Sequence, residues 1–243
     1  MPGRLLDILL LGLVLVSSDC TSEASHQPEG VTIVSETWNN KLVHVIKTEA
    51  GSVDWNFLVA AKGKTLSRAK LTEIAPRAIV ITNGNYFKED LTPMGLMVDE
   101  GKTINEMRKA DWGVFRLSND RRASIVHRKN HSPRDRTNTE FAIESGPRLV
   151  VDGRAIKTRP GLARRTAIGI CPDNSVILAV FESSVHLKDV SSYMLERWKV
   201  KDAINLDGGS SSQLYLRDKE RLKNVVWGIE VPVMIELVPA LKD

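Results

Sequence analysis

Apolar and polar residues alternate or cluster over short segments through most of the chain, and this pattern predicts a protein built mainly of β-strands. Residues 31–38 and 41–48 form the first predicted hairpin, because the two asparagines between them tolerate the positive φ angles of a tight turn. A second hairpin is predicted over residues 166–182, with a Pro-Asp-Asn turn near its middle. Further strands are expected at 54–61, 78–83, 202–207 and 230–239.

Two segments carry apolar residues at helical spacing instead. Residues 64–78 place leucine, alanine and isoleucine about one turn apart, and Pro76 is expected to end that helix. Residues 187–200 have apolar side chains at i, i+3 and i+4, which indicates an amphipathic helix. The sequence shows neither an internal repeat nor a long linker. We therefore expect residues 31–243 to form a single strand-rich α+β domain with a mixed or antiparallel sheet core and few helices.

The N-terminal segment differs in composition from the rest of the chain. Its apolar run, Ile8–Val16, is too short to span a bilayer and precedes small and polar residues, as in a secretory leader. We expect residues 1–25 to be such a leader and the protein to be exported, into a periplasm or out of the cell. A buried N-terminal helix and lipidation of Cys20 are the alternatives. Without the leader only Cys171 remains, so no disulfide framework is expected.

Length and charge limit the classes of function. A chain of 243 residues, 42% of them hydrophobic, can bury a sizeable core, and a net charge of +4 does not demand a nucleic-acid partner. Basic residues gather at 121–140, where we favour a solvated hairpin and loop over a polyanion-binding arm. No aromatic residue lies among these charges to stack on bases. We expect no nucleic-acid partner and no stable membrane span.

Candidate chemistry lies where four apolar strands run into polar, glycine-containing ends. These ends supply two carboxylates, a cation and two amides, on Glu144, Asp207, Arg165, Asn83 and Asn205. Such a set suits a site for a polar, anionic substrate. Each residue also has an ordinary structural explanation, such as a turn or a surface charge. The residue types alone therefore leave the question open.

The stretch AINLDGGSSSQLYL, residues 203–216, shows this ambiguity most clearly. Its Asp, Gly and Ser residues are those of a hairpin turn. Gly208 and Gly209 would also let the backbone turn sharply beside Asp207 and direct their amides at an anion.

This stretch resembles the NLDGGGS signature of the phosphodiester glycosidase family. Three further segments resemble family motifs in the same order along the chain: ITNGNYFKEDLTPMGLMVDEGK, ESGPRLVVDG and RRTAIGI. The resemblance spans roughly residues 31–238. Three positions depart from it, because Asn85 and Ser210 stand where the family has Gly, and Glu144 where relatives often have Gln or Thr.

The resemblance implies an exported hydrolase that cleaves the glycosidic bond of a sugar-1-phosphodiester, for example an N-acetylglucosamine-1-phosphate diester. The leaving group is a phosphate monoester, so a cation against the phosphate matters more than strong general-acid help. On this basis Arg165 is expected to hold the phosphate, and Asp207, with Glu144 as partner, to act near the anomeric carbon. Expected substrate contacts are Asn83, Gly84, Asn205, Gly208, Gly209, Ser211 and Ser212, with a structural capping role as the alternative for the two serines.

No cofactor is required by these motifs. The histidines are scattered, which argues against zinc, while Asp207, Glu144 and backbone carbonyls are hard ligands of the kind that a divalent cation such as Ca²⁺ prefers. The expected partner is a sugar phosphodiester or a cell-envelope glycan. The alternative function is a non-catalytic protein that binds a cell-envelope glycan or exopolysaccharide. The sequence does not fix the oligomeric state.

Overall fold

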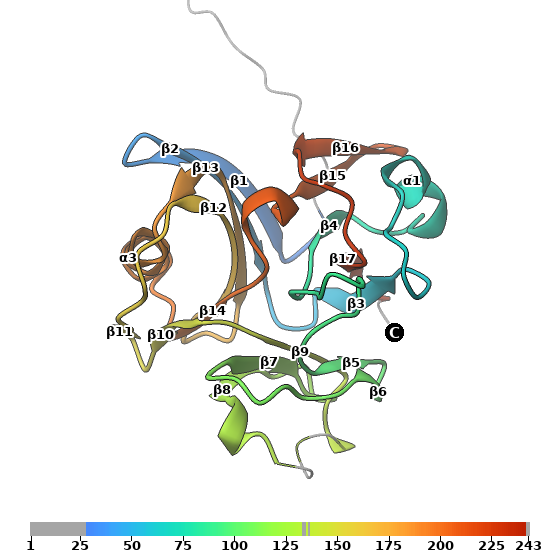
Figure 1. Ribbon diagram of the computed structural model, residues 1–243. Coiled ribbons are helices and arrows are strands. Elements are labelled where there is room, and N and C mark those ends of the chain that lie inside the picture. Colours follow the sequence, from blue (N-terminus) through green and yellow to red (C-terminus); the bar gives the residue numbers. More distant parts are fainter. Residues whose placement is uncertain (1–27, 133–134, 136, 242–243) are drawn as a thin grey trace, which may run out of the picture.

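Three β-sheets stand around a common centre in this computed structural model (Figure 1). The structure describes residues 28–132, 135 and 137–241, so the predicted leader lies outside the described residues. The first sheet has the order β1-β2-β13-β12-β14-β10-β11, the second β16-β15-β4-β17-β3 and the third β6-β5-β9-β7-β8.

The strands of the first sheet are β1 (Val31–Trp38), β2 (Lys41–Thr48), β13 (Val176–Val185), β12 (Ala163–Ile170), β14 (Asp202–Asn205), β10 (Arg148–Val151) and β11 (Arg154–Ala155). Those of the second are β16 (Arg221–Val226), β15 (Leu214–Asp218), β4 (Val80–Asn83), β17 (Val233–Pro239) and β3 (Val53–Val59). Those of the third are β6 (Lys102–Asn105), β5 (Met97–Asp99), β9 (Phe141–Ser145), β7 (Gly113–Leu117) and β8 (Ala123–His127). The α-helices bounded within the described residues are α1 (Leu71–Ile74) and α3 (Leu187–Trp198), and the 3₁₀ turns are η1 (Arg68–Lys70), η2 (Arg128–Asn130) and η3 (Gly209–Ser211).

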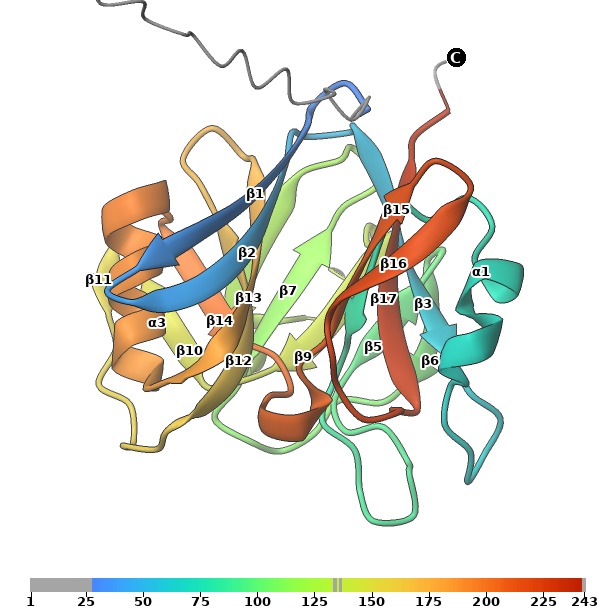
Figure 2. The same ribbon diagram turned by 90° about the horizontal axis from the view of Figure 1, so that it is seen from above.

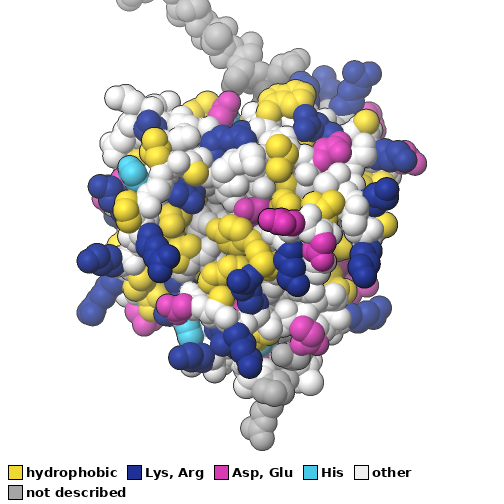
Figure 3. Space-filling view, viewed as in Figure 1, with side chains coloured by type: hydrophobic (Ala, Val, Ile, Leu, Met, Phe, Trp, Pro, Cys, Tyr) yellow, Lys and Arg dark blue, Asp and Glu magenta, His cyan; other side chains and the backbone are white. Residues whose placement is uncertain are grey.

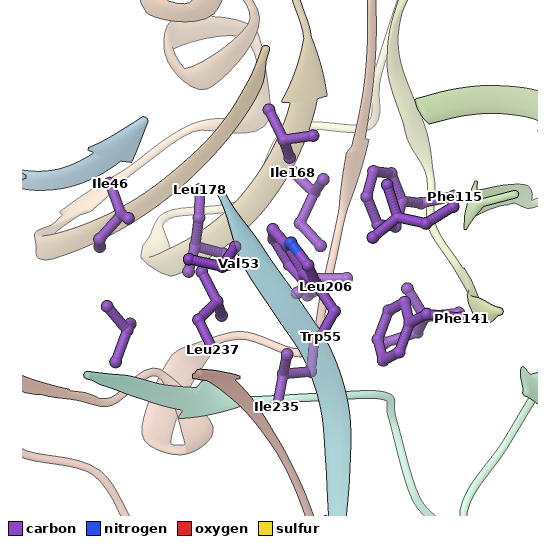
Figure 4. Packing of buried hydrophobic residues seen from close by; sticks show 14 of the residues in the cluster. Ile46, Val53, Trp55, Phe115, Phe141, Ile168, Leu178, Leu206, Ile235 and Leu237 are labelled. Carbon is purple, nitrogen blue, oxygen red and sulfur yellow. The ribbon is translucent and has the colours of Figure 1, made fainter. Parts of the chain in front are cut away.

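Apolar side chains from all three sheets meet in one central core (Figure 4). The Trp55 ring of the second sheet lies 5.4 Å from that of Phe115 and 5.9 Å from that of Phe141, both in the third sheet, between ring centroids. Ile168 of the first sheet is fully buried in the same core. Because every sheet contributes one apolar face, the three cannot separate without exposing it to water.

The expected fold class fits only roughly. Strands dominate the described residues and the helices are few and short, so the protein is mostly β. Every strand pairing found is antiparallel, which decides between the mixed and antiparallel cores that the sequence left open.

The helix predicted at 64–78 is much shorter than expected. Only η1 and α1, residues 68–74, are helical, and the helix ends before Pro76 as predicted. The preceding residues are extended because the Leu66 amide donates to the Val231 carbonyl, 2.9 Å away, and the Leu66 side chain is buried. Tertiary pairing therefore overrides the helical propensity of this segment.

The two predicted hairpins and the second predicted helix are confirmed. Both hairpins form, and Asn39 and Asn40 take φ angles of 47° and 60° in the first turn. Helix α3 buries its apolar stripe against the outer face of the first sheet, where Figure 2 shows it alongside the strands. It begins after His186, whose amide donates to the Asp189 carboxylate at 3.2 Å.

Charged side chains are distributed widely over the surface. The basic stretch 121–140 begins with β8, which pairs with β7 as a hairpin, as expected. On the face shown in Figure 3, an apolar patch near the centre is bordered by both acidic and basic side chains, and further Lys and Arg side chains lie along the outline. Within the described part of the chain, no helix has the length and apolar character needed to cross a membrane.

Candidate active site

The stretch 203–216 is a crossover and not a hairpin. It leaves β14 in the first sheet and enters β15 in the second, so the Asp207 loop (residues 206–213) bridges two sheets (Figure 1). Leu206 at its start is fully buried in the central core, where Figure 4 shows it beside Trp55. The loop is thus anchored by apolar packing next to the candidate carboxylate.

Asn83, the last residue of β4, holds the Asp207 loop in place. Its Nδ2 donates to the Asp207 carbonyl at 2.8 Å, and its Oδ1 accepts from the Thr166 hydroxyl at 2.8 Å and from the Gln213 amide at 3.2 Å. Only 1% of the residue is exposed, so these bonds are formed away from water. Asn83 therefore positions the loop from within and does not present its amide to a substrate.

The Asp207 carboxylate lies at the edge of this network with few partners. Its Oδ1 accepts from the Gly208 amide at 2.8 Å, and the residue is partly exposed. Burial raises the pKa of the carboxyl group above the ordinary Asp value, while hydrogen bonds from the Ser211 side chain and the Gly208 amide oppose the shift. The group thus keeps free lone pairs for chemistry.

Glycines are required at close approaches around Asp207. A Cβ at Gly208 would lie 3.0 Å from the Arg164 carbonyl oxygen, and a Cβ at Gly84 would lie 2.9 Å from a Val233 methyl group. Gly209 has a φ of +62°, which L side chains rarely adopt. The Gly84 carbonyl accepts from the Asp207 amide at 3.3 Å. These glycines shape the loop, which is a structural basis for their expected place in the site.

Arg165, on β12, lies beside the Asp207 loop at Gly208. Its Nη2 donates to the Gly161 carbonyl at 2.7 Å and its Nε, at 3.5 Å, to that of Val185. Its Nη1 lies 3.9 Å from where a Gly208 Cβ would be, and it donates to no described residue. Burial lowers the pKa of the guanidinium, which remains a cation with one free edge toward Gly208.

Arg164 next to it has a different task. Its Nε donates to the Gly209 carbonyl at 3.1 Å and its Nη2 to that of Ser210 at 3.2 Å, while Nη1 donates to the Trp227 carbonyl. All three hydrogen bonds go to backbone carbonyl oxygens. Of the two adjacent arginines, Arg164 therefore clamps the loop and Arg165 faces it with a spare donor.

Tyr86 is a further residue beside the Asp207 loop, to which it is bonded through Asn205, and sequence reasoning missed it. Burial and the Asp207 charge raise the pKa of its hydroxyl to about 12, although the Asn205 hydrogen bond and the Arg165 charge oppose this shift. The hydroxyl donates to the Gly146 carbonyl at 3.0 Å and accepts from Asn205 Nδ2 at 2.8 Å. The phenol therefore stays protonated, with both charged groups near enough to affect it.

A signal for Tyr86 was present in the sequence. It lies in NGNYF, part of a segment that resembles a family motif, three residues after Asn83. Trp112 packs beside it with ring centroids 5.4 Å apart, and the Arg108 guanidinium lies 5.3 Å from the Trp112 centroid. No sequence pattern links Trp112 to Tyr86, because they belong to different segments brought together by folding.

The Glu144 carboxylate has hydrogen-bond partners that differ from those of Asp207 and Arg165. Its side chain is fully buried, and its Oε2 accepts from the backbone amides of Leu96 at 2.9 Å and Arg108 at 2.8 Å. Its Oε1 lies 3.7 Å from Arg128 Nε. Among the described residues the carboxylate contacts neither of the other two charged groups. These contacts fit a role in holding the loops around β5.

The remaining residues expected to contact the substrate differ in whether their polar atoms are hydrogen-bonded within the protein. Asn205 is fully buried, and its Oδ1 has no hydrogen-bond partner among the described residues. Ser211 is buried beside the Asp207 carboxylate, whereas Ser212 Oγ lies 3.4 Å from the Thr166 hydroxyl. Ser211 therefore lies nearer to the candidate chemistry than Ser212, whose contact is within the core.

The candidate site does not form an obvious metal centre. Over the described ranges, no group of three or more His, Cys, Asp or Glu residues is placed to hold a metal ion. Asp207 and Glu144, the two hard ligands that the sequence offered for Ca²⁺, do not contact each other. The divalent cation stays a prediction.

Comparisons with known proteins bear on this arrangement. Residues 76–236 match the family model described as phosphodiester glycosidase. A search of curated proteins found no match to the sequence.

Similar folds occur among solved structures. The catalytic domain of zebrafish N-acetylglucosamine-1-phosphodiester alpha-N-acetylglucosaminidase, auto-inhibited by its pro-peptide, superposes with a TM-score of 0.67 at 17% identity, covering 87% of this chain and 82% of that one. A hypothetical protein from Synechocystis gives 0.62 at 14% identity, covering 87% and 62%. At these identities the likeness is one of fold. Because the family model matches well over half of the chain, this protein belongs to the phosphodiester glycosidase family.

Proposed function

We propose that the protein hydrolyses the glycosidic bond of a sugar-1-phosphodiester and releases the free sugar and a phosphomonoester. One observation carries the proposal: the Arg165 guanidinium of β12 lies beside Gly208, the residue that follows Asp207 on the loop that joins two sheets. A carboxylate and a guanidinium at one place suit a substrate whose anomeric carbon and phosphate are neighbours. Family membership supports the same reaction class.

In this proposal Arg165 binds the phosphate. Its Nη1 donates to no described residue, and it lies beside Gly208. A guanidinium remains charged at any ordinary pH and donates two parallel hydrogen bonds to phosphate oxygens. As the bond to the anomeric carbon breaks, this cation stabilises the negative charge that develops on the departing phosphate monoester.

Asp207 acts at the sugar. Positive charge develops at the anomeric carbon as the carbon–oxygen bond breaks, and an ionised carboxylate stabilises it. The oxygen of water then bonds to that carbon, the phosphate oxygen takes the electron pair of the broken bond, and the water proton passes to a base. Asn83 and Gly84 support this step by fixing the backbone of Asp207 on both sides.

The protein is also proposed to be exported. The support is the apolar run Ile8–Val16 followed by small residues. Intact-mass measurement of protein from a secreting host tests this, with a species lacking about the first 25 residues as the expected product. A mature species that begins at Met1 contradicts export by this route.

The test of the activity is a panel of sugar-1-phosphodiesters that differ in the sugar and in the alcohol, with separate detection of free sugar and phosphomonoester. The protein is expected to release both products in equal amounts from at least one diester. Arg165→Lys should weaken kcat and KM together, because lysine keeps the charge but loses the bidentate geometry. Binding of a diester without product release would instead favour a glycan-binding protein.

A further inference from the structure

A serine, a histidine and a glutamate form a hydrogen-bonded series across three strands of the first sheet. Ser35 is on β1, His44 on β2 and Glu182 on β13, and these strands lie side by side (Figures 1 and 2). Ser35 Oγ lies 2.7 Å from His44 Nδ1, and His44 Nε2 lies 3.2 Å from Glu182 Oε2. A hydroxyl, an imidazole and a carboxylate in this order are the parts of a hydrolytic triad.

The strand register places the three side chains on one face of the sheet. Ser35 lies directly opposite His44 in the β1–β2 pair, and His44 lies directly opposite Val180 in the β2–β13 pair. Glu182 follows Val180 by two residues on the same strand, so its side chain is on the same face. His44 and Glu182 are 138 positions apart in the sequence. Strand pairing therefore brings the series together, and no local motif reports it.

The hydrogen-bonding capacity of each group fixes the place of the protons. An ionised carboxylate can only accept, so His44 Nε2 carries the ring proton and donates to Glu182. In a neutral imidazole the other nitrogen is an acceptor, so His44 Nδ1 accepts from the Ser35 hydroxyl. This is the arrangement in which an imidazole takes a proton from a serine while a carboxylate orients the ring and stabilises the imidazolium.

The surroundings suit an exposed nucleophile with a sheltered base. Ser35 is exposed, whereas only 5% of His44 is exposed. β1 is the edge strand of its sheet, so one side of its backbone has no strand partner among the described residues. Amides along such an edge are available to donate to the negative oxygen of a reacting ester. Ile33 and the exposed Leu42 add apolar surface on the same face, each two residues from a member of the series.

We propose that Ser35, His44 and Glu182 form a second hydrolytic site, which cleaves esters of short carboxylic acids. The apolar surface of Ile33 and Leu42 suits an acyl chain of a few carbons. The site would attack an acyl carbon, whereas the reaction proposed for Asp207 takes place at an anomeric carbon. The two proposals share no residue.

The reaction consumes the ester and water only. Ser35 Oγ bonds to the carbonyl carbon as its proton passes to His44 Nδ1. The bond from that carbon to the alcohol oxygen then breaks, and the oxygen leaves with the electron pair and takes the proton from His44. Water next bonds to the acyl carbon and gives a proton to His44. Ser35 Oγ leaves with the electron pair, recovers that proton, and the carboxylic acid is released.

The test uses the full chain with p-nitrophenyl acetate and p-nitrophenyl butyrate, and a fluorophosphonate probe whose position is found by peptide mapping. Hydrolysis of both esters and labelling of Ser35 are expected. Ser35→Ala should lower the rate of ester hydrolysis about 100-fold and remove the label, and Glu182→Gln should lower the rate about tenfold. Thr37→Ala is the matched control, because Thr37 is exposed on the same face of β1 and should change neither readout.

Ser35→Ala also separates this inference from the proposed function, since it should leave the melting temperature and the cleavage of a sugar-1-phosphodiester unchanged. The inference is overturned if the protein hydrolyses neither ester faster than Ser35→Ala does, if the probe labels a different residue, or if Glu182→Gln keeps the full rate. Because Ser35 and Glu182 are exposed, their variants are expected to fold, and the test needs no variant of the buried His44.

Discussion

Asp207 and Glu144 are both acidic residues at the ends of apolar strands, yet their surroundings are opposite. Glu144 is fully buried and its carboxylate accepts two backbone amides, besides lying near Arg128. Asp207 is partly exposed and accepts one backbone amide at 2.8 Å. Its charge raises the pKa of Tyr86, and the charge of Arg165 lowers it. Of two carboxylates placed at the ends of apolar strands, one therefore holds loops together and the other is open to a substrate.

The difference teaches how to rank carboxylates for chemistry. A fully buried acid that accepts backbone amides, as Glu144 does through Oε2, stabilises the fold. An acid with few partners at a loop edge, close to a cation and a protonated phenol, can exchange partners during a reaction. The predictions below test this ranking, beginning with the largest expected effect.

Asp207→Asn should reduce kcat on the order of 10³-fold, or roughly 4 kcal/mol of transition-state stabilisation. Asparagine keeps the size and the turn preference of aspartate, so the fold and most substrate binding should remain. The measurement is kcat and KM on a cleaved diester, with thermal melting as the control. A near-normal kcat in a folded variant would mean that Asp207 has only a structural role in the turn.

Glu144→Gln should mainly reduce stability. Loss of the charge weakens two hydrogen bonds to amides and the nearby Arg128 pair, so we expect a loss of about 2 kcal/mol of unfolding free energy, with kcat changed less than tenfold. Urea unfolding measures the first quantity and kinetics below the melting temperature the second. A variant of normal stability that has lost its kcat would reverse the comparison and place Glu144 in the reaction.

Tyr86→Phe should lower kcat by about tenfold, equivalent to about 1.4 kcal/mol. The change removes the bond to the Gly146 carbonyl and leaves Asn205 Nδ2 without its hydroxyl partner. A double-mutant cycle sharpens the comparison: the Tyr86 effect should disappear in an Asp207→Asn background and persist in Glu144→Gln. The opposite pattern would connect the phenol to Glu144.

The dependence of kcat/KM on pH should show a smaller effect, which also arises from the Asp207 carboxylate. Because the pKa of Asp207 is raised, kcat/KM should fall on acidification at a pH above the ordinary Asp value of 3.8. The folded state binds the extra proton, so the Asp207 contribution to stability should increase as pH falls while activity decreases. Glu144→Gln should leave the acid limb unchanged, and a limb displaced by that variant would contradict the assignment.

Local sequence patterns were sufficient for the strands and for most of the turns. The asparagine pair predicted the first hairpin, and the apolar spacing predicted the buried face of α3, because each depends on neighbouring residues only. The helix at 64–78 was predicted too long, since pairing of Leu66 with Val231 is a contact between distant segments. No local pattern reports such a contact.

The candidate site was predictable in its residue types but not in its geometry. The resemblance pointed to Asp207, Arg165 and Asn83, and the contacts place all three around one loop. The resemblance did not show that all hydrogen bonds of the Asn83 side chain are made within the protein. Nor did it show that the Glu144 carboxylate accepts from backbone amides near β5. The direction of a side chain depends on strand register and on which sheet receives the next strand. Tyr86 was missed for the same reason.

The hydrogen bonds of Asn83 have a consequence for how the protein folds. They join residues separated by 124, 83 and 130 positions in the sequence. Closing such long loops costs entropy before any contact is gained, and chains dominated by distant pairings fold slowly. During synthesis the Asp207 loop has no scaffold until its own residues and β15 have followed β4 and β12 out of the ribosome. The protein should therefore acquire its site among the last events of folding, as one cooperative step.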